Sequence, residues 1–391
     1  MIKKTFKILG KTLLVIFILL NLIILFYGRW YLYKGLWNTY CKGRSGVSAT
    51  EYLIFENRKI EANSPEPWPI AKNYNTAKMP IEIENDLKSV QIHAYAIIKN
   101  DTLVHEQYWD NFSDTSHTNS FSMGKSYTSA LLGCAIKDGY IKSIDEPVST
   151  YIPEFKNDWR KAITLKHLAT MSSGIAFDES YSNPFSYPAE GYYSTDLLKA
   201  TLRYTEKVFE PGTQFDYLSG NTALLGYCIT KAINKSLSEY MSEKLWTPMG
   251  CEQPAWWSVD KANGLEKAFC CINSNVKDFA RMGKLYMHYG NWNGKQLMDS
   301  SFIANSIVPF DGLDQDGVTK NHTYGYSWWL TEYKGLKIFY MRGLLNQYVI
   351  CIPEKKLVIA KLGRKRRAPS SLHTPPDVAL CIDAALEMYG K

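Results

Sequence analysis

Strand-like runs lie near both ends of this 391-residue chain, and helix-like segments fill the middle. The first two runs, residues 90–98 and 102–108, flank the turn-forming residues Lys99, Asn100 and Asp101, a pattern typical of a β-hairpin. Further strands are predicted at 324–330, 336–341, 347–352 and 357–362, and a last helix at 377–388. This order predicts an α+β fold: an antiparallel sheet assembled from distant segments and flanked by helices, plus a helical subdomain at about 140–290.

The N-terminal segment is a candidate membrane helix. Residues 12–27 (TLLVIFILLNLIILFY) are almost wholly apolar, and four lysines precede them. A spanning helix needs about 20 residues, which the run reaches if it continues through Tyr33 with Arg29 at the level of the lipid headgroups. No A-x-A cleavage site follows, so we expect residues 1–35 to be retained as a transmembrane anchor rather than removed as a signal peptide. The lysines then place the rest of the chain outside the cytoplasm, in a periplasmic or extracellular space.

Positive charge is concentrated in the same segment. The first 50 residues hold eight Lys or Arg and no acid, which leaves 37 basic and 38 acidic residues in the remainder. A near-neutral body does not indicate a nucleic-acid surface. After the anchor we expect a linker and extended lead-in over residues 36–85, which includes the Pro-bearing stretch 63–80, and then one folded domain over 86–391. The sequence carries no sign of the oligomeric state.

The eight cysteines form no CxxC motif and no Cys/His metal spacing, so no metal or other cofactor is expected. Most lie inside apolar runs, where a free cysteine acts as a small hydrophobic residue. We interpret the adjacent pair Cys270 and Cys271 as packing residues rather than a redox element. Export would permit disulfides, but their pairing does not follow from the spacing.

A candidate nucleophile lies at the start of the predicted helix 122–138. Ser122, Met123, Gly124 and Lys125 form an S-x-x-K motif, and residues three apart share a helical face. The lysine amine can therefore reach the serine hydroxyl and accept its proton, and the helix N-terminus favours developing negative charge. Alone this motif is weak, because chance matches are common.

Two further elements follow in order. In the segment 209–226 (FEPGTQFDYLSGNTALLG), a Pro-Gly turn precedes Tyr217, Leu218 and Ser219 at the start of a predicted helix. In the segment 339–363, a strand ends at Gly343 and a strand pair returns. Together with the S-x-x-K motif, they resemble the serine β-lactamase-like, or penicillin-binding-protein-like, family. That family includes class C β-lactamases, DD-peptidases, related carboxylesterases and aminohexanoate-dimer hydrolases.

The resemblance covers residues 88–391 and implies a β-lactamase/transpeptidase-like fold and a serine hydrolase. It implies that Ser122 is the nucleophile, Lys125 the general base and Tyr217 the proton relay to the leaving group. The implied oxyanion hole consists of the backbone N–H groups of Ser122 and Leu344. The expected partner is a small-molecule or peptide substrate. The competing hypothesis is a weakly active or inactive receptor for cell-wall peptides, against which the presence of all three catalytic residues argues.

The third element departs from the family's usual Lys-Thr-Gly or His-Thr-Gly, because it reads Met341-Arg342-Gly343. We expect Ser219, Met341, Arg342 and Gly343 to line the substrate site, with Arg342 as an alternative source of the missing cation. Ser219 in place of asparagine resembles the esterase and amidase branches. We therefore expect an esterase or amidase rather than a β-lactamase.

Other candidate residues receive structural interpretations. His167 is expected to pack or cap a helix, and the basic run Arg364–Arg367 to form a solvated turn, with lipid headgroup contact as the alternative. Two tryptophan pairs, 256–257 and 328–329, are expected in the core or in a cleft wall. No G-x-S-x-G or H-E-x-x-H motif is present, which disfavours an α/β-hydrolase elbow and a metalloprotease site.

Overall fold

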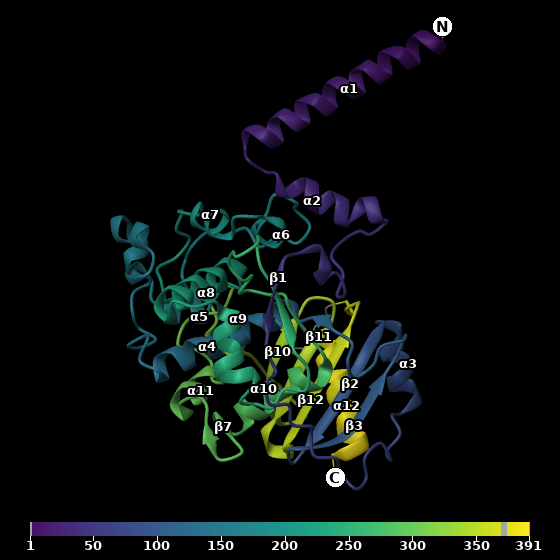
Figure 1. The fold of residues 1–391 in the computed structure, drawn as a ribbon, viewed down its shortest axis with the longest axis vertical. Coiled ribbons are helices and arrows are strands. Elements are labelled where there is room, and N and C mark those ends of the chain that lie inside the picture. Colours follow the sequence, from purple (N-terminus) through teal and green to yellow (C-terminus); the bar gives the residue numbers. More distant parts are fainter. Residues whose placement is uncertain (1, 369–373, 391) are drawn as a thin grey trace.

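A six-stranded antiparallel sheet forms the centre of the molecule (Figure 1). The computed structural model describes residues 2–368 and 374–390, with side chains from residue 5 onward, so that the side chains of Lys3 and Lys4 lie outside it. The strand order is β3-β2-β12-β11-β10-β9. The strands are β2 (Ile92–Lys99), β3 (Thr102–Tyr108), β9 (Trp329–Tyr333), β10 (Leu336–Gly343), β11 (Gln347–Ile352) and β12 (Leu357–Gly363). The predicted sheet assembled from both ends of the chain is therefore confirmed.

The β2–β3 hairpin turns at the residues that the sequence indicated. Asn100 and Asp101 have φ values of 49° and 61°, and two successive left-handed residues match the twist of the flanking strands. The predicted strand 324–330 is wrong in its bounds, because β9 begins only at Trp329. Ser327 has a φ of 60°, so the chain turns there instead of running extended from Tyr324.

Helices cover both faces of this sheet. On β11, Tyr348, Ile350 and Ile352 pack with α12 (Pro376–Tyr389) and α3 (Ile81–Ser89) in one apolar cluster. Val349 and Cys351 point to the opposite face, into the cluster that includes α4 (Gly124–Lys137) and α10 (Val276–Met287). Alternation with a period of two therefore buries every residue of the strand.

The middle of the chain folds mainly as helices beside α4. They are α5 (Leu165–Ala169), α6 (Tyr187–Tyr193), α7 (Leu197–Leu202), α8 (Ser219–Ile233), α9 (Leu237–Met241) and, after α10, α11 (Ser300–Ser306). His167 caps α5: its backbone N–H donates to Thr164 Oγ1 at 3.4 Å, and its Nδ1 accepts from Thr164 N–H at 3.3 Å.

Short strands also form outside the main sheet, and two of them, β5 and β6, lie within the region expected to be helical. A second sheet has the order β1-β5-β6-β4, built from β1 (Asn57–Ile60), β4 (Thr118–Asn119), β5 (Ala255–Ser258) and β6 (Ile272–Ser274). The hairpin β7 (Asn291–Trp292) and β8 (Lys295–Gln296) follows α10. Strands of two to four residues are too short for periodicity to detect. Because β1 comes from the expected lead-in, that segment wraps onto the body.

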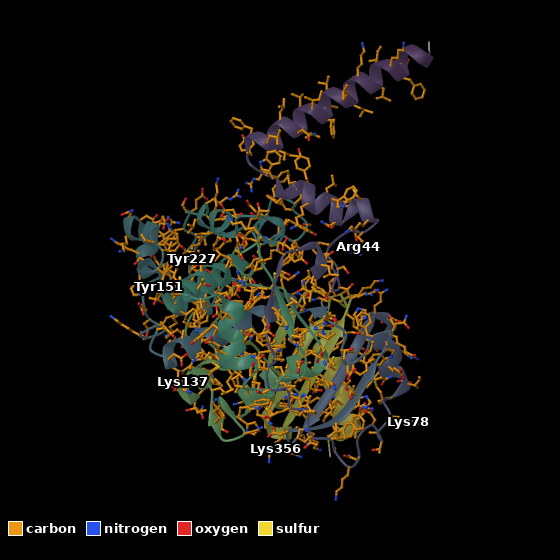
Figure 2. All side chains as sticks on the ribbon, in the orientation of Figure 1. Arg44, Lys78, Lys137, Tyr151, Tyr227 and Lys356 are labelled. Carbon is orange, nitrogen blue, oxygen red and sulfur yellow. A yellow bond between two sulfur atoms is a disulfide. The ribbon has the colours of Figure 1, made fainter. Side chains whose placement is uncertain are left out.

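The N-terminal segment divides into two helices, α1 (Ile2–Phe26) and α2 (Tyr31–Asn38). Residues 5–26 are long and apolar enough to cross a membrane, with a mean hydropathy of 2.6. α1 extends away from the body, with side chains on all its sides (Figure 2). The expected continuation of the helix through Tyr33 is wrong, because the chain turns at Gly28, whose φ is 63°. Arg29 donates to Glu190 Oε2 of α6 at 2.7 Å and so belongs to the body.

Candidate active site

Ser122 lies in a tight turn just before α4. The turn is a single 3₁₀ segment, Phe121–Met123. Phe121 has a φ of 43°, a backbone angle that residues other than glycine rarely adopt. Ser120 fixes the turn to β6, because its N–H donates to the carbonyl oxygen of Ile272 at 2.7 Å and its Oγ accepts from Ile272 N–H at 3.1 Å. The Ser122 side chain is half-buried, so a substrate can reach it on a rigid support.

Lys125 is only 1% exposed, and its amine contacts three oxygens. Nζ lies 3.1 Å from Ser122 Oγ, 3.0 Å from Ser219 Oγ and 3.0 Å from the carbonyl oxygen of Phe269. A carbonyl oxygen only accepts hydrogen bonds, so the Lys125 amine donates one hydrogen bond to Phe269. If the neutral amine donates its second hydrogen bond to Ser219, its lone pair faces Ser122. The geometry suits transfer of a proton from Ser122 to Lys125.

The Phe269 carbonyl lies close to α4 because Gly124 has no side chain. A Cβ at Gly124 would approach the Cys270 backbone to 3.1 Å. Cys270 and Cys271 form a disulfide with each other, which corrects their interpretation as unpaired packing residues, although both are buried. Neighbouring residues of an extended chain point to opposite sides, but Cys271 has a φ of 72°. That local turn is not visible in the sequence.

Tyr217 lies beside Lys125, immediately before α8. Nζ of Lys125 is 5.1 Å from the centroid of the Tyr217 ring, and the ring packs against Trp329 and Tyr324 with centroid distances of 5.0 and 5.9 Å. Among the residues that the structure describes, the Tyr217 hydroxyl has no hydrogen-bond partner. It remains available to a bound molecule, and Trp329 serves as part of the wall beside it.

Ser219 connects Lys125 to a carboxylate that the sequence analysis missed. Its hydroxyl lies 2.5 Å from Glu179 Oε1, and its N–H donates to Glu179 Oε2 at 2.7 Å. Burial raises the pKa of Glu179, although the charge of Lys125 and the hydrogen bonds from Ser219 and Tyr181 act against this rise. Ser219 is only 2% exposed, so it contacts Lys125 and Glu179 rather than lining the substrate site as expected. Glu179 lies in an irregular loop and carries no motif that could have identified it.

The third element brings the end of β10 against the turn that carries Ser122. A Cβ at Gly343 would collide with the carbonyl oxygen of Ser120, so only glycine allows this approach. Leu344 follows directly, and within the described part of the chain its N–H has no acceptor. Arg366 donates to the Gly343 carbonyl oxygen at 2.7 Å, which corrects the expectation that the whole basic run is a solvated turn.

Met341 and Arg342 point to opposite faces of β10. Met341 is fully buried in the core between the sheet and α4, so its expected role in lining the substrate site is wrong. Its neighbours on β10 alternate, and the Arg342 guanidinium lies 5.3 Å from the centroid of the Trp329 ring. Two cations, Arg342 and Arg366, therefore lie near Gly343. The presence of methionine at position 341 is no evidence that the site lacks a positive charge.

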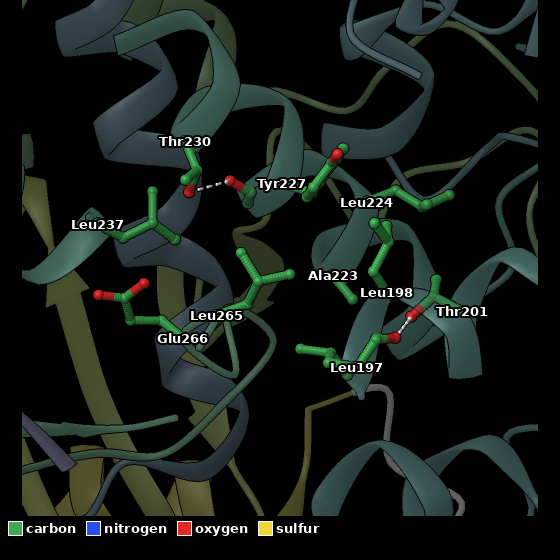
Figure 3. A pocket seen from close by; sticks show the side chains of 11 residues that line it. Leu197, Leu198, Thr201, Ala223, Leu224, Tyr227, Thr230, Leu237, Leu265 and Glu266 are labelled. Atoms are coloured by element: carbon green, nitrogen blue, oxygen red, sulfur yellow. Dashed lines mark hydrogen bonds between the residues drawn. The ribbon is translucent and has the colours of Figure 1, made fainter. Parts of the chain in front are cut away.

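A small internal cavity of about 10 Å³ lies elsewhere, between α7, α8 and the chain near Leu265 (Figure 3). Thr201 and Thr230 line it, but their hydroxyls donate to backbone carbonyls of their own helices. Neither Ser122 nor Lys125 borders this cavity. No group of three or more His, Cys, Asp or Glu that could hold a metal ion occurs among the described residues.

Comparisons with known proteins agree with this geometry. The beta-lactamase family model matches residues 89–380. The chain is 21% identical over 305 residues to the 6-aminohexanoate-dimer hydrolase of Paenarthrobacter ureafaciens, covering 72% of this chain and 75% of that protein. It is 31% identical over 141 residues to a beta-lactamase of Escherichia coli, covering 36% of this chain and 35% of that protein.

The solved structure of a putative 6-aminohexanoate-dimer hydrolase from Bacillus anthracis superposes with a TM-score of 0.72 at 20% identity, covering 87% of this chain and 92% of that one. In this chain, Lys125 lies beside Ser122 and Tyr217, and Gly343 lies against the turn that carries Ser122. The match of the family model extends over well more than half of the chain. The chain therefore belongs to the beta-lactamase family and is a hydrolase of that family.

Proposed function

We propose that this protein cleaves an ester or amide bond through a covalent acyl-enzyme on Ser122. The observation that carries the proposal is the position of the Lys125 amine, 3.1 Å from Ser122 Oγ and in contact with the acceptor oxygen of Phe269. A buried lysine held at this distance is a base for the serine proton. Intact catalytic groups favour an enzyme over a receptor for cell-wall peptides.

In the acylation step, Ser122 Oγ attacks the carbonyl carbon of the substrate while its proton passes to Lys125 Nζ. The carbonyl oxygen becomes an oxyanion, for which we propose the N–H groups of Ser122 and Leu344 as donors. Collapse of the tetrahedral intermediate expels the alcohol or amine. Tyr217 gives its proton to that leaving group and regains one from Lys125, so that the amine ends the step neutral.

In the second step, water attacks the acyl-enzyme. Tyr217, whose hydroxyl has no partner among the described residues, takes a proton from that water and passes its own proton to the neutral amine of Lys125. The oxyanion forms in the same position and collapses with return of the proton to Ser122 Oγ. The products are the carboxylic acid and the free serine.

We infer the substrate class from the relatives of this chain and not from the methionine at position 341, where the family usually has a cation. The 6-aminohexanoate-dimer hydrolase is similar to this chain over 305 residues, which supports an amide or ester of small size. A preference for esters over β-lactams cannot rest on Met341, because that side chain is buried. A screen of p-nitrophenyl esters, D-amino-acid peptides and nitrocefin would rank the classes directly.

The test of the proposal is covalent labelling. A fluorophosphonate probe should react with the wild-type protein, and mass spectrometry should place the adduct on Ser122. Ser122→Ala should lose labelling and lower ester turnover by several orders of magnitude, because the attacking atom is gone. Adduct formation elsewhere, or a folded Ser122→Ala variant that keeps more than about a hundredth of wild-type turnover, contradicts the assignment.

We also propose that α1 anchors the protein in a membrane with the hydrolase outside the cytoplasm. The length and hydropathy of residues 5–26 support a span, and the preceding lysines support this orientation. Tyr31 of α2 donates to the carbonyl oxygen of Pro184 at 3.0 Å, and Arg29, just before α2, pairs with Glu190, so α2 is held by the body next to the end of α1.

A further inference from the structure

The Glu179 carboxylate receives three donors, two of them from Ser219. Oε2 accepts from Ser219 N–H at 2.7 Å, and Oε1 lies 2.5 Å from Ser219 Oγ and 2.9 Å from the Tyr181 hydroxyl. A backbone N–H can only donate, so Oε2 must be an acceptor. Two hydroxyls share Oε1, an arrangement that suits an ionised carboxylate, which only accepts.

This arrangement fixes the direction of the Ser219 hydroxyl. If its proton points to Glu179, its oxygen lone pairs are left for Lys125, whose Nζ lies 3.0 Å away. The neutral amine then donates to Ser219 and to Phe269, and its lone pair faces Ser122. If the Ser219 proton pointed to Lys125, the lone pair of the amine would accept that hydrogen bond and could not accept the proton of Ser122.

We propose that Glu179 is a positioning residue for acylation: through the Ser219 hydroxyl, its carboxylate aims the Lys125 lone pair at Ser122 and then stabilises the ammonium that forms. The inference rests on the proposed acyl-enzyme mechanism. In the step itself, the Ser122 O–H bond breaks, a bond from Oγ to the substrate carbonyl carbon forms, and the proton moves to Nζ. Glu179 exchanges no atom, and its negative charge offsets the new positive charge two hydrogen bonds away.

The charges around Glu179 agree with this role. Lys125 on α4 is the cation whose field lowers the pKa of Glu179, against the larger effect of burial. The other groups that interact with it are tyrosines, Tyr181 on its own loop, Tyr187 on α6 and Tyr204 after α7. Tyr217 and Arg366 interact electrostatically with Tyr181. Lys125 is the cation that these interactions join directly to Glu179.

The test compares Glu179→Gln with a matched variant of the same loop. A glutamine must keep its oxygen toward Ser219 N–H, so its amide donates to Ser219 Oγ and reverses the hydroxyl. Asp178→Asn removes the neighbouring negative charge, but Asp178 contacts Ser180 and Asn183 and neither Ser219 nor Lys125. The readout is the burst of p-nitrophenol from p-nitrophenyl acetate, measured between pH 5 and 9 with the full-length protein in detergent.

We expect Glu179→Gln to slow the burst by about ten- to a hundredfold, the factor for one charged hydrogen bond, with KM little changed. The acid limb of its pH profile should move to lower pH, because the attraction that favours the protonated amine is gone. Glu179→Asp keeps the charge and should keep the position of that limb. Asp178→Asn should resemble the wild type in both rate and profile.

Three outcomes overturn the inference. Glu179→Gln could keep the wild-type burst, it could lose activity with an unmoved pH profile, or Asp178→Asn could reproduce its effect. The second and third outcomes would mean that Glu179 only stabilises its loop. If Glu179→Gln does not fold, the profile of Glu179→Asp decides: an acid limb shifted from the wild-type position contradicts the role of the charge. Failure of the wild type to label at Ser122 refutes the proposed function instead, so the two failures are distinguishable.

Discussion

At the residue scale, one arginine holds the peptide between Gly343 and Leu344. Arg366 donates to the Gly343 carbonyl oxygen at 2.7 Å. In a planar trans peptide the C=O and the following N–H point in opposite directions. The contact therefore turns Leu344 N–H away from Arg366, and the guanidinium charge polarises the peptide so that this N–H is a better donor.

We accordingly predict that Arg366→Gln lowers kcat for a neutral p-nitrophenyl ester by about tenfold, a factor set below that of a buried charged hydrogen bond because this side chain is exposed. The matched control is Arg342→Gln, which removes a nearby cation that rests on Trp329. It should change kcat by less than about twofold. An equal loss of kcat in both variants would show that kcat depends on the positive potential near Gly343 and not on the orientation of the peptide between Gly343 and Leu344.

The sequence predicted the residues that we propose to carry the chemistry but not those that would orient them. Ser122, Lys125 and Tyr217 are recognisable because their spacing is fixed by two helix starts. Glu179, the Phe269 carbonyl and Arg366 reach the site from loops, and their positions depend on tertiary contacts that no local pattern encodes. The burial of Met341 was missed for the same reason: alternation gives two faces for β10 without saying which one faces the core.

At the element scale, α2 presents two different faces. Tyr31, Asn38 and Gly35 face the body, where a Cβ at Gly35 would lie 3.3 Å from the Tyr193 ring. Aromatic residues on α2 and directly next to it are exposed: Trp37 within the helix is 65% exposed, and Trp30 before it and Tyr40 after it are 61% and 69% exposed. Aromatic residues gather at membrane interfaces, and only four residues separate the end of α1 from the start of α2. If α1 spans a membrane, this aromatic face should rest on the lipid surface.

We predict that brominated phosphatidylcholine vesicles quench the tryptophan fluorescence of the reconstituted full-length protein through Trp30 and Trp37. The double variant Trp30→Phe and Trp37→Phe should lose most of this quenching. Trp159→Phe is the control, because Trp159 lies on the body and donates to the Thr205 carbonyl oxygen. Unchanged quenching in the double variant would place α2 away from the bilayer.

The bounds of longer elements were predictable, and those of the N-terminal helices were not. A run of alternating or apolar residues determines β11, β12 and α12 to within a residue or two. Hydropathy alone does not show where α1 stops, because Trp30, Tyr31 and Leu32 remain apolar. The chain turns at Gly28, whose φ is 63°, and Arg29 then pairs with Glu190, a residue distant in sequence.

At the scale of the whole molecule, buried histidines make stability depend on pH. His93 on β2 is fully buried and stacks on Phe112 with a centroid distance of 3.8 Å, and its two ring nitrogens have no hydrogen-bond partner among the described residues. Burial, helped by the charge of Arg364, lowers its pKa to about 4. Burial also lowers the pKa of His105 on β3 and of His167 on α5.

These shifts fix the sign of the pH effect. An unfolded histidine takes up its proton near pH 6.5, whereas the folded protein protonates His93 only near pH 4. Between these values the unfolded state binds more protons, so the free energy of unfolding decreases as the pH falls. The stabilisation is complete above about pH 6.5 and is lost toward pH 4. One such histidine changes the free energy by at most about 1.4 kcal/mol per pH unit.

We therefore predict that the urea midpoint of the protein in detergent micelles decreases from pH 7 to pH 4.5, and that His93→Phe makes this decrease shallower. Phenylalanine keeps the stacking on Phe112 but takes up no proton, so the slope of the unfolding free energy should fall by up to about 1.4 kcal/mol per pH unit near pH 5. His288→Gln is the control, because water reaches that exposed side chain in the folded as well as the unfolded protein. An unchanged slope in His93→Phe would mean that His93 is protonated in the folded state, in which case Asp110, the acid whose field raises its pKa, outweighs burial.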